Sequence, residues 1–340
     1  MNRIDSAVQK AARLMEKGEV FILTGHERPD GDAAGSVLGL GDALTSHGKQ
    51  VMMFASDELA NSLSFLPGSS RIQRRLPDNL PQDYILVLLD CNEEDRVGEY
   101  GPRLVKEASS VIILDHHLGE GFCKELSQPC VSVIDTKACA TAEICLRLMK
   151  VLNWEVTKKI ATCFYTAIVT DTGGFRYSNT SSTTFKIARQ LVLAGADPYE
   201  IALNCFESKS LAKLKLLGLA LETLETFYNG RVSVMLLTPD MFALCGAKES
   251  ETDDFVSYAR GIDTVEVAIL IKEVKSGRIS VSLRSKHSVN VAELAGRFGG
   301  GGHFNAAGFK TTGDPLEIKE KVVALAGEYL IEKVSTTSKD

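Results

Sequence analysis

The chain has 340 residues, of which 44% are hydrophobic and 24% charged, and its formal net charge is −6. This length exceeds what one hydrophobic core usually organises, so two domains are expected. The negative charge argues against a protein that wraps long nucleic acid, because such a protein needs a basic surface to displace counterions.

The cysteines and the N-terminal segment indicate where the protein works. The eight cysteines include no C-x-x-C pair and no zinc-type spacing, so we expect reduced, buried thiols instead of a disulfide framework or a structural zinc site. Residues 1–25 carry charges throughout and lack the apolar core of a signal peptide, and no apolar run approaches the length of a membrane span. The sequence therefore predicts a cytoplasmic protein with no membrane partner.

The first half of the chain repeats one local pattern. Residues 2–17 have the periodicity of an amphipathic helix. Short apolar runs that end at or just before a polar residue follow at 20–23, 84–89, 111–114 and 131–134. Helical stretches such as 33–46 lie between them, so we predict an α/β fold with a parallel sheet and helices on both faces. Ligands bind outside the carboxyl ends of strands in such sheets, which is where His26, Asp90 and Asp115 are expected.

The second half follows a different pattern. Residues 183–226 are predicted to be helical nearly throughout. After Asn229-Gly230 the apolar runs become longer, and two of them flank a turn at 275–277, which is typical of a β-hairpin. We predict a catalytic domain, a helical connector and a smaller α+β substrate-binding domain, at residues 1–195, 196–228 and 229–340.

The segment HERPDGD places His26, Asp30 and Asp32 within seven residues, on a loop just before a predicted helix. All three side chains can bind a metal. Pro-Asp-Gly-Asp is also a favourable turn sequence, however, and Asp32 could simply cap the helix. This segment alone leaves both interpretations open.

Three further segments carry polar side chains at the ends of apolar runs. Asp90 ends the run ILVLLD. The triplet Asp115-His116-His117 follows VIIL; adjacent side chains diverge, so one histidine can bind a metal while the other faces a substrate and Asp115 orients them. Asp171 follows an apolar helical run and precedes two glycines.

These segments together predict a metal centre with imidazole and carboxylate ligands and no thiolate. Its ligands would be His26, Asp30, Asp32, Asp90, His116 and Asp171. Such a set suits Mn²⁺ or a similar first-row ion better than Ca²⁺ or structural zinc. Two such ions can clamp the attacking and leaving oxygens of a phosphoryl group and activate a water. Asp90 is the expected bridging carboxylate.

A run of four glycines at 299–302 predicts a second binding element. Glycine lets backbone N–H groups approach an anion, and His303, Arg284 and Arg297 supply positive charge. Residues 272–310 contain seven Lys or Arg against two Glu. The alternative is a flexible linker, but the flanking Phe298 and the apolar Ala306-Ala307 favour a folded loop.

The motifs GHERPDGDAAGS, LLDCNEEDR, LDHH, TDTGGFRYSNT and GGGGHFNAAG, in this order, resemble those of DHH-family phosphoesterases with a DHHA1 C-terminal domain. The resemblance covers nearly the whole chain and is closest to the NrnA-like group. It implies hydrolysis of short oligoribonucleotides (nanoRNA and dinucleotides) to mononucleotides, of 3′-phosphoadenosine 5′-phosphate (pAp) to AMP, or of both. The alternatives are a phosphodiesterase for cyclic di-AMP or pApA, an exopolyphosphatase-like enzyme, and a non-catalytic nucleotide sensor.

The resemblance also implies roles for individual residues. Two Mn²⁺ ions are expected, with Co²⁺ or Mg²⁺ as substitutes. The first would be held by His26, Asp30 and Asp90, and the second by Asp32, Asp90, His116 and Asp171. Asp115, behind the ligands, and His117, at the scissile phosphate, would serve catalysis. The rest of the substrate would contact Arg284, Gly300, Gly301, Gly302, His303, Arg260, Ser282 and Asn305. Short RNA and nucleotides are the expected partners, no long nucleic acid is expected, and a homodimer is left open.

Overall fold

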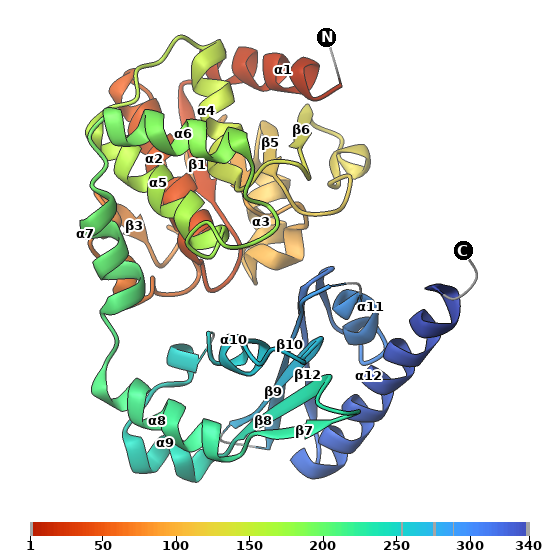
Figure 1. Ribbon diagram of the computed structural model, residues 1–340. Helices are drawn as coiled ribbons and strands as arrows, with labels where there is room; N and C mark the ends of the chain where they lie inside the picture. The colour runs from red at the N-terminus through yellow and green to blue at the C-terminus, as the bar shows by residue number, and fades with distance from the viewer. Residues whose placement is uncertain (1–2, 253, 275–276, 288, 338–340) are drawn as a thin grey trace. The chain divides into compact units, whose positions relative to one another are not determined.

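The protein is described from a computed structural model (Figure 1). The structure describes residues 3–252, 254–274, 277–287 and 289–337, without the side chains of His303 and residues 331–337. The chain divides into two compact units, Met1–Ser208 and Lys209–Asp340. The assignment of the three predicted segments to catalysis, connection and substrate binding remains a prediction.

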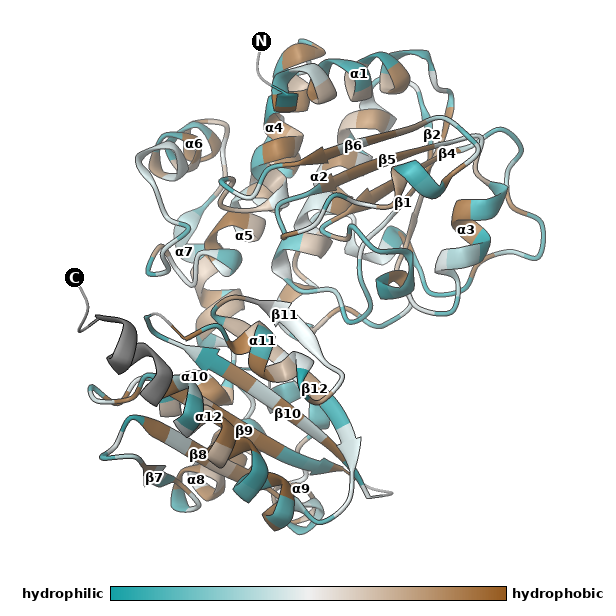
Figure 2. Ribbon diagram, turned by 90° about the vertical axis from the view of Figure 1, so that its right-hand side faces the viewer, coloured by the Kyte–Doolittle hydropathy of each residue, from teal (hydrophilic) through white to brown (hydrophobic). Residues whose placement is uncertain are grey.

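The first unit is built on a six-stranded parallel sheet of order β3-β2-β1-β4-β5-β6. Its strands are β1 Val20–Thr24, β2 Gln50–Phe54, β3 Ile72–Gln73, β4 Ile85–Leu89, β5 Ser110–Asp115 and β6 Cys130–Ile134. Every residue of β4 is buried, as expected for a central strand covered on both faces. Figure 2 shows the same preference in the hydrophobic colours of β5 and β6. The predicted parallel α/β sheet is confirmed.

Helices pack on both faces of this sheet. The larger core contains residues from α1 Arg3–Lys17, α2 Gly31–Ser46, α4 Thr141–Val151 and α5 Lys158–Asp171. The other face packs against α3 Gly101–Glu107. The unit continues through α6 Ser182–Leu193, α7 Pro198–Ala202 and the π-helical turn η5 Leu203–Glu207. Short 3-10 turns are η1 Asn61–Leu63, η2 Ser69–Arg71, η3 Glu94–Val97 and η4 Cys123–Glu125.

Helices α2 and α5 approach each other unusually closely because α2 carries glycine every four residues. A Cβ atom at Gly31 would overlap the side chain of Thr170, and one at Gly35 would overlap the carbonyl oxygen of Cys163. Glycine is therefore required for this spacing. The close packing brings the start of α2, with Asp32, near the end of α5, with Asp171.

The second unit contains a mixed sheet of order β11-β12-β10-β9-β8-β7, in which only the β8–β9 pair is parallel among the described pairs. Its strands are β7 Glu225–Phe227, β8 Val232–Leu237, β9 Val267–Val274, β10 Arg278–Ser285, β11 Gly301–His303 and β12 Ala306–Thr312. One core includes α11 Val291–Gly296 and α12 Pro315–Thr337, and the other includes α8 Leu211–Glu222, α9 Pro239–Cys245 and α10 Phe255–Arg260. A 3-10 turn, η6, spans Glu249–Thr252.

Two details of the second unit bear on the sequence predictions. Strands β9 and β10 pair antiparallel, as the predicted hairpin requires, and residues 275 and 276 of its turn lie outside the described residues. Residues 225 and 226 were expected to be helical but lie in β7. Helix α8 ends at Glu222, and the following backbone pairs with β8, a non-local contact that helical periodicity does not detect.

The prediction that all cysteines are reduced is wrong for one pair. Cys123 and Cys130 form a disulfide, with their Cα atoms 5.2 Å apart. The chain turns back between η4 and β6, which brings the two residues together although their spacing fits no recognised motif. The cysteines that the structure leaves as thiols include four buried ones, Cys91, Cys139, Cys145 and Cys163.

Within the part of the chain that the structure describes, no helix combines the length and apolar character needed to cross a bilayer.

Candidate metal centre

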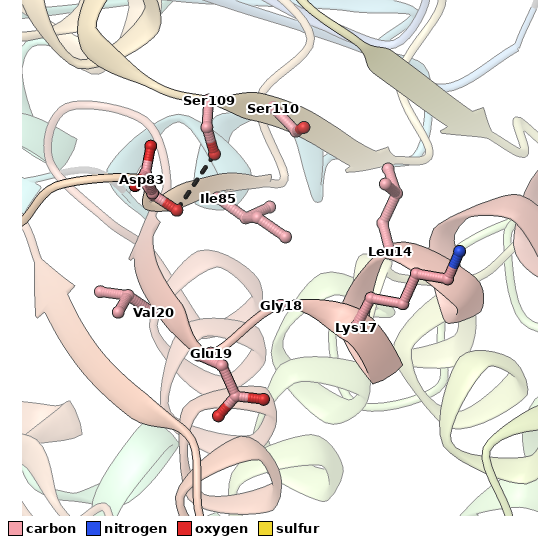
Figure 3. Close-up of a pocket in the computed structure, with 9 residues that line it drawn as sticks. All are labelled: Leu14, Lys17, Gly18, Glu19, Val20, Asp83, Ile85, Ser109 and Ser110. Atoms are coloured by element: carbon pink, nitrogen blue, oxygen red, sulfur yellow. Dashed lines mark hydrogen bonds between the residues drawn. The ribbon is translucent and has the colours of Figure 1, made fainter.

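The two edges of the parallel sheet differ in chemistry. A shallow depression of about 340 Å³ lies at the amino ends of β1, β4 and β5, and Ser109 Oγ donates a hydrogen bond of 3.1 Å to the carbonyl oxygen of Asp83 at its border (Figure 3). Its lining includes none of the predicted site residues. The predicted residues His26, Asp30, Asp32, Asp90 and 115–117 lie instead at or just after the carboxyl ends of β1, β4 and β5.

The first of these loops leads into α2, and its two aspartates have different local roles. Asp30 is the N-cap of α2: its Oδ1 accepts hydrogen bonds from the backbone N–H groups of Asp32 and Ala33 at 3.0 and 3.1 Å. The interpretation of Asp32 as the cap of this helix is therefore wrong. Asp32 is buried within the first turn and accepts a hydrogen bond from Ser36 Oγ at 2.9 Å.

Asp90 follows β4 in a left-handed conformation, with φ of 60°. This conformation is uncommon for a residue other than glycine, although aspartate adopts it more readily than most. The backbone N–H of Asp90 donates to the carbonyl oxygen of Leu114 at 3.0 Å. Its Oδ2 lies 3.4 Å from Nε2 of His26, and its Oδ1 lies 3.5 Å from Nε2 of His116. Oδ1 also lies 3.3 Å from Nδ1 of His117, so Oδ2 faces one imidazole and Oδ1 faces two.

The Asp115-His116-His117 triplet at the end of β5 is organised by its aspartate. Asp115 Oδ1 accepts hydrogen bonds from the backbone N–H groups of both histidines and, at 2.6 Å, from Nδ1 of His117. His116 turns its Nδ1 toward the carbonyl oxygen of Ala138, 3.3 Å away. Its Nε2 therefore points toward the carboxylates of the cluster, at 3.6 Å from Asp32, 3.5 Å from Asp90 and 3.6 Å from Asp171.

Two residues that contact the candidate ligands were missed by the sequence predictions. Asn179 Nδ2 donates to Asp171 Oδ2 at 3.1 Å and to the carbonyl oxygen of Cys139 at 2.9 Å. Asn179 lies in the motif TDTGGFRYSNT, so its presence there was a usable signal. Thr141 donates its backbone N–H to Asp32, and its Oγ1 lies 3.3 Å from Asp90 Oδ1. No side-chain pattern indicates a backbone donor.

The carboxylates and imidazoles of this cluster shift one another's pKa values. Burial alone would lower the pKa of His26 and His116, but hydrogen bonds and charge attraction from neighbouring carboxylates raise both to about 11. Burial would also lower the pKa of His117, but hydrogen bonds and charge attraction from Asp115 and Asp90 raise it to about 9. Burial and the nearby Asp90 raise the pKa of Asp171 to about 7, although His116 opposes the shift. Without metal, the three imidazoles therefore stay protonated at neutral pH, and their positive charge offsets the charge of the carboxylates.

The ligand atoms form three overlapping groups, within each of which they lie no more than 4.8 Å apart. These groups are His26 with Asp30 and Asp90, Asp32 with His116 and Asp171, and Asp90 with His116 and His117. The first group contains the three residues predicted for one ion, and the second contains three of the four predicted for the other, without Asp90. The donor set of imidazole nitrogen and carboxylate oxygen fits first-row divalent ions, and binding would displace the protons described above.

In the second unit, strand register brings together part of the predicted substrate-binding set. Adjacent positions on three neighbouring strands form two rows, one of Arg284, Ala306 and His303 and one of Ser282, Gly308 and Gly301. The side chain of His303 lies outside what the structure describes, but its backbone, in β11, pairs with Ala306 of β12. At Gly301 and Gly308, neighbours in the second row, no side chain covers the backbone.

The remaining predicted residues of that unit are Gly300, Gly302, Asn305 and Arg260. A Cβ atom at Gly300 would overlap the carbonyl oxygen of Gly308, and Gly302 adopts φ of 141°, which L-residues rarely adopt. Asn305 Nδ2 donates to Ser285 Oγ at 3.0 Å and so fixes the turn between β11 and β12. Arg260 ends α10.

Comparison with known proteins agrees with this geometry. The sequence model of the DHH family N-terminal domain matches residues 20–168, and that of the DHHA1 domain matches residues 241–332. The bifunctional oligoribonuclease and PAP phosphatase NrnA of Thermus thermophilus is 33% identical over 315 residues, which cover 92% of this chain and 91% of that protein. The chain belongs to the DHH family.

Solved structures extend the comparison. An exopolyphosphatase-related protein from Bacteroides fragilis matches this DHH protein with a TM-score of 0.86 and 26% identity, covering 100% of both chains. RecJ from Thermus thermophilus in complex with Mn²⁺ matches with a TM-score of 0.53 and 14% identity, covering 95% of this chain and 55% of RecJ, which shows the fold alone. DHH proteins are phosphoesterases, so the chain is a hydrolase of phosphoester bonds.

Proposed function

We propose that this enzyme hydrolyses short oligoribonucleotides to mononucleotides and pAp to AMP. The observation that carries the proposal is the position of Asp90, whose two oxygens face His26 and His116, the imidazoles of two adjacent ligand groups. Such a bridged arrangement suits attack of water on a phosphoryl group. The activities named for the NrnA relative support the choice of substrates.

The cofactor in this proposal is a pair of Mn²⁺ ions, which Co²⁺ or Mg²⁺ could replace. His26, Asp30 and Asp90 would hold one ion, and Asp32, Asp90, His116 and Asp171 the other. When bound, such ions lower the pKa of a coordinated water and stabilise charge on the phosphoryl oxygens. The donor set of imidazole nitrogen and carboxylate oxygen, without thiolate, supports this choice of ion.

In this scheme His117 acts on the substrate. Its Nδ1 is held by Asp115 at 2.6 Å, which fixes the orientation of the ring and leaves Nε2 as the atom that we propose contacts the scissile phosphate. A histidine held in this way can donate a proton to the leaving oxygen. Asp115 has no exposed surface and acts only through the loop and the ring that it orients.

For the second unit we propose the role of gripping the rest of the substrate. The exposed backbone of the glycine strand and the neighbouring Arg284 support the binding of a phosphate or nucleotide, with Gly300, Gly302, His303, Arg260, Ser282 and Asn305 as further contributors. We also propose that the enzyme acts in the cytoplasm, where its nucleotide substrates arise.

A homodimer forms part of the proposal. Helix α8 exposes Leu211, Leu214 and Leu221, of which Leu211 is 69% exposed. A second copy of the chain could cover these apolar side chains. Size-exclusion chromatography with light scattering tests this part: a dimer that Leu214→Glu converts to a monomer supports it, and a monomeric wild-type protein contradicts it.

The decisive experiment incubates the purified protein with Mn²⁺ and a panel of substrates, followed by identification of the products. The panel contains pAp, a diribonucleotide, pApA, cyclic di-AMP, a long RNA and inorganic polyphosphate. We expect turnover of pAp and of the diribonucleotide, and none after exhaustive chelation. Preference for polyphosphate would instead favour an exopolyphosphatase, the activity for which the Bacteroides fragilis protein is named.

A further inference from the structure

The loop between β6 and α4, together with the first turn of α4, forms one wall of the metal centre. We refer to residues 135–142 as the supporting segment. Its contacts with the ligands use backbone groups: the carbonyl oxygen of Ala138 faces Nδ1 of His116 at 3.3 Å, and the N–H groups of Thr141 and Ala142 donate to Asp32 at 2.6 and 3.2 Å. The position of this segment therefore fixes the orientation of two ligands of the same ion.

Two buried carboxylates hold the supporting segment. Asp135 Oδ1 accepts a hydrogen bond from the N–H of Lys137 at 3.1 Å, at the start of the segment. Glu143 Oε2 accepts from the N–H of Cys139 at 3.1 Å, in its middle. Each of these carboxylate residues is only 7% exposed. A buried carboxylate needs a compensating partner.

A single side chain, Arg147 of α4, pairs with both carboxylates. Its Nη2 lies 2.5 Å from Asp135 Oδ2 and 3.5 Å from Glu143 Oε1. The guanidinium group thus fastens the carboxylates to each other and the supporting segment to α4. Both contacts come from Nη2, which carries two N–H bonds and can therefore donate to the two carboxylates at once.

The contacts of the supporting segment are distributed unequally between the two proposed ions. Its backbone reaches Asp32 and His116, and Asn179 connects the carbonyl oxygen of Cys139 to Asp171. All three are ligands of the second ion. The side chain of Thr141 lies 3.3 Å from Asp90, the shared ligand. His26 and Asp30, by contrast, bond to their own loop, to α2 and to Asp90.

We propose that Arg147 is a positioning residue for the second metal ion: through Asp135 and Glu143 it holds the backbone groups that orient Asp32 and His116. The inference rests on the two-ion site of the proposed function. Groups that orient metal ligands from behind commonly contribute about 10- to 100-fold to metal affinity. Loss of Arg147 therefore weakens binding of the second ion and leaves the first nearly unchanged.

The test is a calorimetric titration of the full-length, metal-free protein with Mn²⁺. His26→Ala and Asp171→Ala serve as references that assign each Kd to one of the two ions. For Arg147→Met we expect the Kd of the second ion to rise at least about tenfold and that of the first ion to change less than about threefold. Arg147→Lys, which retains the charge but not the fork of donors, is expected to restore part of the affinity.

The matched control is Arg103→Met. Arg103 lies on α3 of the same unit. It also pairs with a carboxylate, that of Glu107 at 3.0 Å, and donates to the carbonyl oxygen of Asp78. This variant is expected to leave both Kd values unchanged. If Arg147→Met does not fold, Arg147→Lys is measured in its place, and a selective rise in the second Kd is expected for it too.

Two results would overturn the inference: unchanged Kd values in the folded Arg147 variant, or an equal rise in both. A wild-type protein that binds fewer than two Mn²⁺ ions would instead contradict the two-ion site of the proposed function. The two failures are therefore distinguishable in one set of titrations.

Discussion

The backbone N–H of Thr141 donates a hydrogen bond of 2.6 Å to the carboxylate of Asp32, which lies 109 residues earlier in the chain. Thr141 is the first residue of α4, and the first N–H groups of a helix have no partner within it. Asp32 therefore caps α4 although it belongs to α2. The favourable interaction of a carboxylate with a helix N-terminus helps to keep this buried group in place.

The first prediction separates the two roles of Asp32. Asp32→Asn and Asp32→Ala both remove the charge, and we expect both to lose the second ion. Only the asparagine retains an acceptor for the N–H groups of α4, so the metal-free Asp32→Asn variant should exceed Asp32→Ala in free energy of unfolding by about 1 to 2 kcal/mol. Urea denaturation measures the difference, and equal stabilities would argue against the capping role.

The second prediction concerns the bridge. Asp90→Ala removes a carboxylate that belongs to both proposed ligand sets, so this variant should lose both Mn²⁺ ions. Asp32→Ala should mainly lose one. Elemental analysis after gel filtration counts the ions, with the wild-type protein as reference. If Asp90→Ala retains the wild-type metal content, Asp90 is not a ligand of either ion.

The third prediction concerns pH. The raised pKa values of His26 and His116, about 11, mean that their protonated forms stabilise the metal-free fold fully below pH 6.5, and that this contribution is lost as the pH rises toward 11. Metal binding needs the neutral imidazoles, so it strengthens over the same interval. The increase in Tm caused by Mn²⁺ should therefore be larger at about pH 8 than at pH 6.5.

Differential scanning fluorimetry at both pH values, with and without Mn²⁺, measures this effect. Asp90→Ala provides the control, because a variant without metal should show no Mn²⁺-dependent change in Tm at either pH. An increase in Tm that is smaller at the higher pH would contradict the proposed exchange of protons for metal.

The sequence predicted the parts of this site that depend on side-chain type and local order. Apolar runs of full strand length marked β1, β4, β5 and β6, and polar residues at their ends gave the candidate ligands. Strand β3 has two residues, too few for a periodic signal, and the order of the sheet depends on pairings distant in sequence. The hydrogen bond from Thr141 could not be predicted, because every non-proline residue has a backbone N–H.

The fourth prediction distinguishes the two histidines of the triplet. His116 Nε2 points into the carboxylate cluster, so His116→Ala should lose one ion together with activity. His117→Ala should retain both ions while kcat falls about 100-fold or more, because a proton donor is removed. Metal analysis and steady-state kinetics on pAp test both variants. A loss of metal in His117→Ala would reassign His117 to the ligand set.

The last prediction tests whether a ligand approaches the glycine strand. A Cβ atom at Gly301 would meet no other atom within 4 Å, so Gly301→Ala should leave the fold, the Tm and the metal content unchanged. If a phosphate or nucleotide packs against this backbone, the added methyl group occupies its space and should raise KM for pAp about tenfold or more, since a misfitting methyl group costs about 1 to 3 kcal/mol.

Hydrolysis of a small activated phosphodiester, which needs only the metal centre, should be unaffected in this variant. Gly218→Ala in α8 is the matched control, because a Cβ atom there also meets nothing within 4 Å and Gly218 lies outside the proposed substrate-binding elements. An unchanged KM for pAp in Gly301→Ala would show that no substrate group lies against Gly301. An equal loss of activity on the small diester would show that the substitution acts on the metal centre or on the fold, because the small diester does not reach the strand and cannot contact the added methyl group.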